Sequence, residues 1–199
     1  MKLFSYIVTH DTGFAPNPFW GYCTLACCKP TIRRCAHPGD WVVGLSRKLS
    51  GNKLIFAMHI DKKTTFSDYW NDPVFNSKRP RYDTARVIDK RGDNIYEPQV
   101  NGEFHQLRSI HSLEQKDHDL KGQYVLVAKE FVYYGNQAIS LPRYMDFLKV
   151  SRGHRSRFSD DELCTFGKYI KTLPRGIQGP PSYKWPANEL SWKQNEGIY

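Results

Sequence analysis

The chain has 199 residues, of which 40% are hydrophobic and 25% are charged, a composition typical of one soluble globular domain. No apolar run approaches the roughly 18 residues of a membrane span, and the N-terminal segment lacks the apolar stretch and cleavage site of a signal peptide. We therefore expect a cytoplasmic protein with no membrane partner, and the net charge of +9 favours an anionic partner, nucleic acid first.

The first half of the chain predicts strands and short helices separated by turn signals. Residues 2–9 alternate apolar and polar side chains, as in a strand, and the Gly-, Pro- and aromatic-rich segment 10–22 predicts a loop. The other elements expected in this half are a helix begun by Pro30 over 31–36, a strand over 41–46 opened by the Gly39-Asp40 turn, a connection over 48–52, a returning strand over 53–60, and a helix over 64–73 capped by Thr64 or Thr65.

The second half contains the strongest signals for single elements. Asn101-Gly102 predicts a hairpin turn, and residues 123–135 predict one long strand because they are rich in β-branched and aromatic side chains. Ser159 and Glu162 form a capping-box pattern that opens a helix through about residue 172. The elements together predict an α+β class and a single domain over 1–199. Its core covers about 2–150, and a C-terminal helix and an aromatic, Pro-rich tail over 151–199 pack on that core.

The five cysteines predict free thiols, because an odd number and no export signal fit a reducing compartment. Cys23, Cys27, Cys35 and His37 can be drawn as a zinc site. However, the chain has no C-x-x-C pair, and the adjacent Cys27 and Cys28 fit no usual ligand spacing. We therefore predict no metal and no cofactor.

Several separate segments resemble one known family in the same order along the chain. Residues 4–19 read FSYIVTHDTGFAPNPF and residues 92–96 read GDNIY, and both are similar to segments of the nucleotide modification-associated domain family, type two. The Gly-Asp turn at 39–40 and the Asp-Pro ending at 72–73 also resemble the PUA-like superfamily, related to EVE, YTH and ASCH domains. The resemblance covers most of the chain, roughly residues 2–150. It implies a PUA-like fold, a small, strongly twisted β-barrel with short flanking helices, associated with DNA modification, restriction or phage defence.

The leading functional hypothesis is a binding module that recognises a modified nucleobase or nucleotide in an aromatic-lined pocket, by analogy with EVE and YTH relatives. Aromatic faces stack on a base, while amide and carboxylate groups bond to its edge. The candidate ligand-binding residues are Phe14, Asn17, Phe19, Trp20, Trp41, Asp93, Asn94 and Tyr96. Core packing for the rings and ordinary turn bonding for the polar groups are the alternatives.

Arginines supply the candidate phosphate contacts, because the guanidinium group binds phosphate in a bidentate manner. The candidates are Arg33, Arg34, Arg79 and Arg155, the last just before the expected helix. A solvated basic face is the alternative. The expected partners are nucleic acid or a nucleotide that carries a modified base, together with DNA-modification or restriction proteins, and a homodimer stays open.

The sequence contains no recognised catalytic motif such as a P-loop, HExxH or GxSxG, so we predict a reader without catalysis. The alternative is an enzyme that modifies a base or nucleotide in the same cleft, using His10, Asp11 or a cysteine. A Cys–His pair formed by tertiary contact leaves no pattern in the sequence. A scaffold that docks through its basic surface is the third hypothesis.

Overall fold

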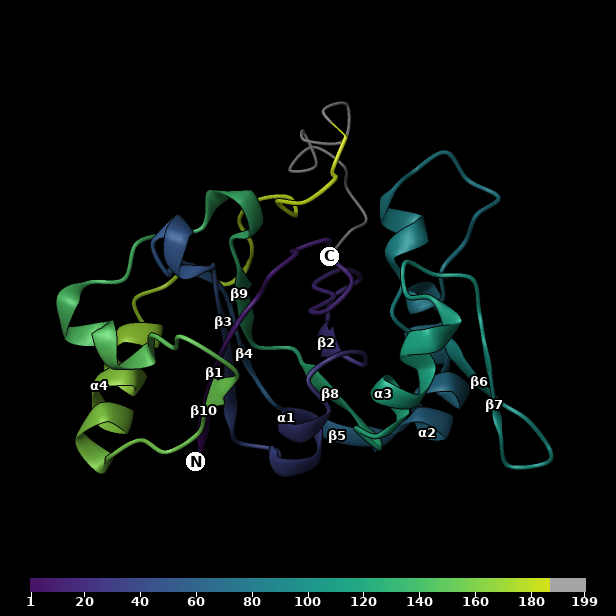
Figure 1. Cartoon of the computed structure of the whole chain (residues 1–199), viewed down its shortest axis with the longest axis horizontal. Helices are drawn as coiled ribbons and strands as arrows, with labels where there is room; N and C mark the ends of the chain where they lie inside the picture. The colour runs from purple at the N-terminus through teal and green to yellow at the C-terminus, as the bar shows by residue number, and fades with distance from the viewer. Residues whose placement is uncertain (187–199) are drawn as a thin grey trace.

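The computed structural model describes residues 1–186, whose strands form three sheets (Figure 1). The strands are β1 (Leu3–Ile7), β2 (Cys23–Leu25), β3 (Trp41–Leu45), β4 (Leu54–His59), β5 (Lys62–Thr65), β6 (Tyr96–Pro98), β7 (Phe104–Gln106), β8 (Tyr124–Ala128), β9 (Phe131–Tyr133), β10 (His154–Arg155) and β11 (Gly176–Ile177). The α-helices are α1 (Pro30–Cys35), α2 (Phe66–Asn71), α3 (Lys116–Leu120) and α4 (Asp160–Ile170). No helix of this described part is long and apolar enough to cross a lipid bilayer.

The largest sheet has the strand order β10-β1-β3-β4-β9-β11. β1 pairs with β3 in parallel, while β3 and β4 form the predicted antiparallel hairpin. Alternate side chains of a strand point to opposite faces, so each face of this sheet carries its own apolar set. One face, with Leu3 and Trp41, packs against α4 and its buried Phe166 and Ile170. The capping box of Ser159 with Glu162 is confirmed as the start of α4.

The segments β4–β5 and β8–β9 each connect the large sheet to the second sheet, whose strand order is β2-β8-β5. The His59 N–H donates to the Glu130 carbonyl and the Asp61 N–H donates to the Val127 carbonyl, so both segments bend at the same level. The predicted single strand over 123–135 is therefore wrong. It is two strands, β8 and β9, because one half pairs with β5 and the other with β4.

Apolar cores fill the spaces between the layers. The opposite face of the large sheet, with Tyr6 and Phe56, packs against Leu126 of the second sheet. The outer face of the second sheet packs against α2 and the β6–β7 hairpin, where Phe14 and Tyr69 are buried. Figure 1 shows this order of layers, with α4 at one end and β6–β7 at the other.

Most local predictions are confirmed. α1 begins at Pro30, Thr65 caps α2, and the turn at 99–103 joins β6 to β7. The α+β class is likewise confirmed, but the strands of residues 1–186 do not close a barrel. The large sheet ends in β10 and β11, two residues each, and neither reaches the edges of the second sheet. The predicted tail beyond residue 186 lies outside the described residues.

Candidate functional site

A strained turn presents the thiol of Cys28. β2 ends at Leu25 and α1 begins at Pro30, and between them Cys28 and Lys29 have φ angles of 60° and 41°. A left-handed backbone costs a non-glycine residue on the order of 1–3 kcal/mol, and such strain is concentrated at functional sites. A sharp strand-to-helix turn also presents the nucleophile of a large class of hydrolytic enzymes. Cys28 is half-buried, whereas Cys27 beside it is sealed in the core.

Hydrogen bonds to both backbone groups of Cys28 hold this turn. The Cys28 N–H donates to Asp119 Oδ1 at 2.6 Å, and the Cys28 carbonyl accepts from Arg33 Nε at 2.7 Å. The buried Arg33 guanidinium also donates to the carbonyls of Asp119 and Tyr124. These charge-assisted bonds join α1, α3 and β8, and they offset the strain of the turn.

A histidine and a carboxylate stand beside the thiol. His111 Nε2 is 3.5 Å from Cys28 Sγ, and His111 Nδ1 is 2.7 Å from Asp119 Oδ2. The Tyr96 hydroxyl donates to the same carboxylate oxygen at 2.9 Å. Because the carboxylate accepts the Nδ1 proton, Nε2 faces the thiol and can accept its proton. A thiol, a base and an orienting acid in this order activate cysteine nucleophiles.

The electrostatics of this buried set favour a charged histidine beside a charged carboxylate. Burial alone lowers the pKa of His111, but its bonds to Asp119 and Cys28 outweigh burial and raise that pKa to about 9. Burial raises the pKa of Asp119, but the hydrogen bond and charge of His111 outweigh it, so that the pKa is lowered overall. By contrast, burial raises the pKa of Cys27 well above its ordinary value, and that thiol keeps its proton.

Cys28 lies where two cavities meet. One has a volume of about 410 Å³ and includes Tyr6, Lys29 and His118 in its wall; the other has about 470 Å³ and includes Phe14, His111 and Arg91. Both volumes fall in the range of small-molecule sites. Thr9, His10, Ala15 and Cys28 belong to both walls, so the two cavities form one cleft with the thiol at the junction. Among residues 1–186 no carboxylate lines either cavity, so the charged lining is cationic.

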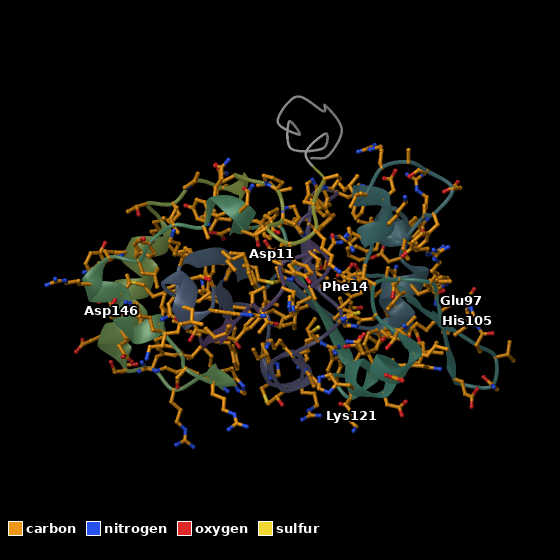
Figure 2. The ribbon with its side chains drawn as sticks, turned by 45° about the horizontal axis from the view of Figure 1, so that its top comes forward. Asp11, Phe14, Glu97, His105, Lys121 and Asp146 are labelled. Atoms are coloured by element: carbon orange, nitrogen blue, oxygen red, sulfur yellow. The ribbon has the colours of Figure 1, made fainter. Side chains whose placement is uncertain are left out.

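The loop between β1 and β2 forms the wall that the two cavities share. In Figure 2, Asp11 and Phe14 of this loop lie in the middle of the molecule, between Asp146 on one side and His105 of β7 on the other. The buried Asp11 carboxylate accepts bonds from the Tyr133 hydroxyl and from Ser182, so it anchors the loop to the C-terminal segment. Of the residues named for the enzyme alternative, His10 therefore lines the cleft, whereas Asp11 is buried behind it.

One group of residues within the described part has the composition of a metal site. Ligand atoms of Cys27, His111 and Asp119 lie within 4.8 Å of one another. The Cys27 thiol already contacts the protein, because its sulfur is 3.9 Å from the Asp93 carbonyl. The imidazole and the carboxylate already bond to each other. The hydrogen-bonded set with Cys28 therefore accounts for this geometry better than a metal does.

The structure places two of the eight predicted ligand-binding residues at this site. The Phe14 ring is 4.8 Å from the His111 ring and lines the cleft. Tyr96 is buried and bonds to Asp119, so it supports the carboxylate.

Three other predicted residues lie in a separate buried network around Lys78. Lys78 Nζ donates to the Asn17 carbonyl and to Asn17 Oδ1, as well as to the Tyr22 carbonyl. Asp93 accepts from the hydroxyls of Thr24 and Tyr69, and Asn94 Nδ2 donates to the carbonyls of Tyr69 and Phe75. All of these polar side chains are bonded within the protein, so a base edge would have to displace existing partners.

The remaining predicted rings do not converge on the cleft. Phe19 is fully buried and packs against Trp20, which is half-buried in the same core. Trp41 lies in the core on the other side of the large sheet, stacked on His59 and in contact with Phe166. The structure therefore does not bring Trp41 together with Phe14 and the 92–96 turn.

The predicted phosphate-binding arginines are also separated. Arg33 is buried under the Cys28 turn. Arg34 is exposed and donates to the Lys121 carbonyl. Arg79 lies over the Trp70 ring at 3.9 Å, and Arg155 Nη2 donates to both carboxylate oxygens of Glu162. Phosphate binding by these arginines stays a prediction, and Arg34 is the only one of the four that is exposed.

Sequence reasoning missed Cys28, His111 and Asp119 as a set. The available signal was a cysteine just before Pro30, in a turn expected to lead into a helix. Its partners lie 83 and 91 residues further along the chain. In the sequence His118 precedes Asp119 directly, but the structure pairs the carboxylate with His111.

The fold and site define an α+β protein in which a cysteine at the junction of a cationic cleft stands beside a histidine and a buried aspartate. The chain belongs to the family described as nucleotide modification associated domain 2, whose model matches residues 1–189. The resemblance carried by residues 4–19 and 92–96 is thereby confirmed. No curated protein and no solved structure gives a significant match to the chain.

Proposed function

We propose that this protein is an enzyme that uses the Cys28 thiol as a nucleophile on a base or nucleotide. The observation that carries the proposal is the geometry of the set, with Nε2 of His111 3.5 Å from the thiol and Nδ1 2.7 Å from Asp119. Membership of a family associated with nucleotide modification supplies the substrate context. The enzyme, rather than the reader, is favoured because Phe19 and Trp41 are sealed in cores and the reader's polar groups already have partners.

The chemistry best matched to these residues is acyl transfer at a carbonyl carbon carried by the base or nucleotide. In the reactive form His111 Nε2 already carries the thiol proton, as the raised pKa of this imidazole favours, and the Cys28 thiolate sulfur bonds to the carbonyl carbon. As the carbon–nitrogen or carbon–oxygen bond breaks, His111 returns that proton to the leaving amine or alcohol. Water, deprotonated by His111, then cleaves the thioester and releases the thiol and a carboxylic acid. Asp119 keeps the imidazole oriented and stabilises its charge throughout.

The wider context of the proposal follows the family. The proposal includes a PUA-like architecture, supported by the two chain segments, β4–β5 and β8–β9, that bend from the large sheet into the second sheet. The protein would act in the cytoplasm beside a DNA-modification, restriction or phage-defence system, on nucleic acid or on a nucleotide that carries a modified base. The alternative of a reader in the same cleft predicts binding without any chemical change of the ligand.

Thiol reactivity tests the proposal without knowledge of the substrate. We expect iodoacetamide to label half-buried Cys28 at least about tenfold faster than the exposed Cys35 and Cys164, because a neighbouring base activates a thiol. Peptide mass spectrometry over a time course measures all three rates in one sample. His111→Gln should slow the labelling of Cys28 alone by about 100-fold.

Acylation provides the second readout. With p-nitrophenyl acetate we expect a burst of p-nitrophenolate that Cys28→Ser removes and that the matched control Cys35→Ser retains. Labelling that follows exposure alone, with Cys35 faster than Cys28 and no response to His111→Gln, would refute the proposal.

A further inference from the structure

We infer that the cavity beside Lys29 binds a phosphate group of the substrate, with the Lys29 ammonium as its principal contact. This assignment rests on the proposed function only for its place beside the nucleophile, and phosphate binding itself is tested separately. The substrate would then be a nucleotide or another species that carries a phosphate, and not a free base.

Lys29 is an unpaired cation held inside the cleft. It follows Cys28 directly in the strained turn and lines the cavity of about 410 Å³. Its Nζ lies 4.7 Å from the centroid of the Tyr6 ring. Within residues 1–186 no carboxylate forms an ion pair with it, whereas the neighbouring Arg33 donates to three backbone carbonyls. Burial lowers the pKa of Lys29, because it disfavours the charged ammonium. An anion bound beside the ammonium would stabilise its charge and offset this cost of burial.

Tyr6 provides an independent sign of a ligand at the same place. It is 1% exposed and lines the same cavity, yet its hydroxyl has no hydrogen-bond partner in the part of the chain that the structure describes. An unsatisfied buried hydroxyl is destabilising, and most such groups in proteins have a partner. The hydroxyl keeps its proton because burial, and secondarily the neighbouring Cys28, raise its pKa well above 10. It is therefore a donor, which suits a phosphate oxygen.

The rest of the lining matches the same chemistry. His10, His118 and His154 are exposed at the rim of this cavity and can donate to an anion. No Asp or Glu of the described residues lines it, so no carboxylate in its wall faces a bound phosphate. A nucleotide held here by its phosphate would extend across the Cys28 junction into the second cavity, whose wall includes Phe14.

Binding is measured by titration calorimetry in the Cys28→Ala background, so that the outcome does not depend on thiol reactivity. The probes are inorganic phosphate, deoxycytidine, its 5′-monophosphate, and a short single-stranded oligonucleotide with and without a 5′-phosphate. We expect phosphate and the monophosphate to bind, and Lys29→Met to weaken the monophosphate about 10- to 100-fold. The control Lys171→Met removes the same charge beyond α4 and should change affinity less than about twofold.

A second variant separates binding from folding. Tyr6→Phe keeps the ring beneath Lys29, and we expect it to weaken phosphate about 3- to 10-fold without lowering the melting temperature, because the lost hydroxyl has no protein partner. Lys29-dependent binding of the oligonucleotide without its 5′-phosphate would identify a backbone diester as the source. Dependence on the terminal phosphate would identify a monoester.

The result that overturns the inference is no binding of any phosphate probe, or an equal loss in Lys29→Met and Lys171→Met. Phosphate binding through Lys29 with an unreactive Cys28 would uphold this site and refute the enzyme. A reactive Cys28 together with a phosphate affinity that Lys29→Met does not change would support the enzyme and refute the phosphate site.

Discussion

The coupling between His111 and Asp119 makes the stability of the fold depend on pH in a way that one substitution should remove. Asp119 is fully buried and accepts bonds from His111, from the Tyr96 hydroxyl and from the Cys28 N–H. Asp119→Asn keeps the size of the side chain and removes its charge. The His111 imidazolium then loses the charged partner on its Nδ1 side, the first of the two groups that raise its pKa.

The sign and size follow from the pKa of His111. Its folded value of about 9 exceeds the ordinary 6.5, so the folded state binds this proton more tightly than the unfolded state does. The stabilisation is fully present below about pH 6.5 and is lost as the pH rises through about 9, a change of roughly 3 kcal/mol at most. The lowered pKa of Asp119 contributes stability that is complete above its ordinary value of 3.8, so it does not vary in this window.

The assay is urea unfolding of the wild-type protein and Asp119→Asn at intervals between about pH 6 and pH 9.5. The difference between the two proteins isolates His111. This matters because burial lowers the pKa of Lys78 to about 8, which adds stability as the pH rises and affects both proteins equally. We expect the advantage of the wild type to shrink by about 2–3 kcal/mol across the range. Asp146→Asn, at an exposed ion pair with Lys149, is the matched control and should show no such trend. A wild-type advantage that is constant with pH would refute the coupling.

Three further predictions concern the framework around the site. Lys78→Met should lower the free energy of unfolding by about 3–5 kcal/mol, because it removes three hydrogen bonds and leaves the buried Asp93 carboxylate without its compensating cation; urea titration measures this, and a loss under about 1 kcal/mol would contradict it. Trp41→Ala should cost about 3–5 kcal/mol without changing the labelling rate of Cys28, because the ring fills a core on the far face of the large sheet; slower labelling at equal folding would argue for a role in the cleft. Gly122→Ala should lower both the melting temperature and the Cys28 labelling rate, because a Cβ there would lie 2.2 Å from the Arg33 guanidinium. The control is Gly167→Ala in α4, where the added Cβ meets no atom within 4 Å and should stabilise the protein by about 1 kcal/mol. Equal behaviour of the two alanine variants would show that Arg33 does not hold the turn.

Elements that depend on neighbours in the sequence could be predicted from it. The α1 start at Pro30, the Thr65 cap of α2 and the Ser159–Glu162 box are interactions within one turn, and they formed as expected. The long strand over 123–135 failed because its break is imposed by another segment. The chain must bend there to pair first with β5 and then with β4.

The candidate site shows the same division. The segment 10–22 was predicted as a loop, and two of its residues, His10 and Phe14, line the cleft. The predicted rings, however, were selected by type, and burial separated them, with Trp41 on the far face of the large sheet. The sequence could not reveal the catalytic candidates, because a hydrogen bond between residues 83 positions apart has no local pattern.

The sequence by itself determined the family, the α+β class and the positive charge, because motif order, local propensity and composition are properties of the sequence and do not depend on how distant segments pack. Only the tertiary structure decided which of five cysteines has a base beside it. Cys28 differs from Cys27 in its surroundings alone: one faces His111 at the junction of two cavities, and the other is sealed in the core with a raised pKa. Burial and partner geometry set the reactivity of a thiol, and both arise when distant segments pack together.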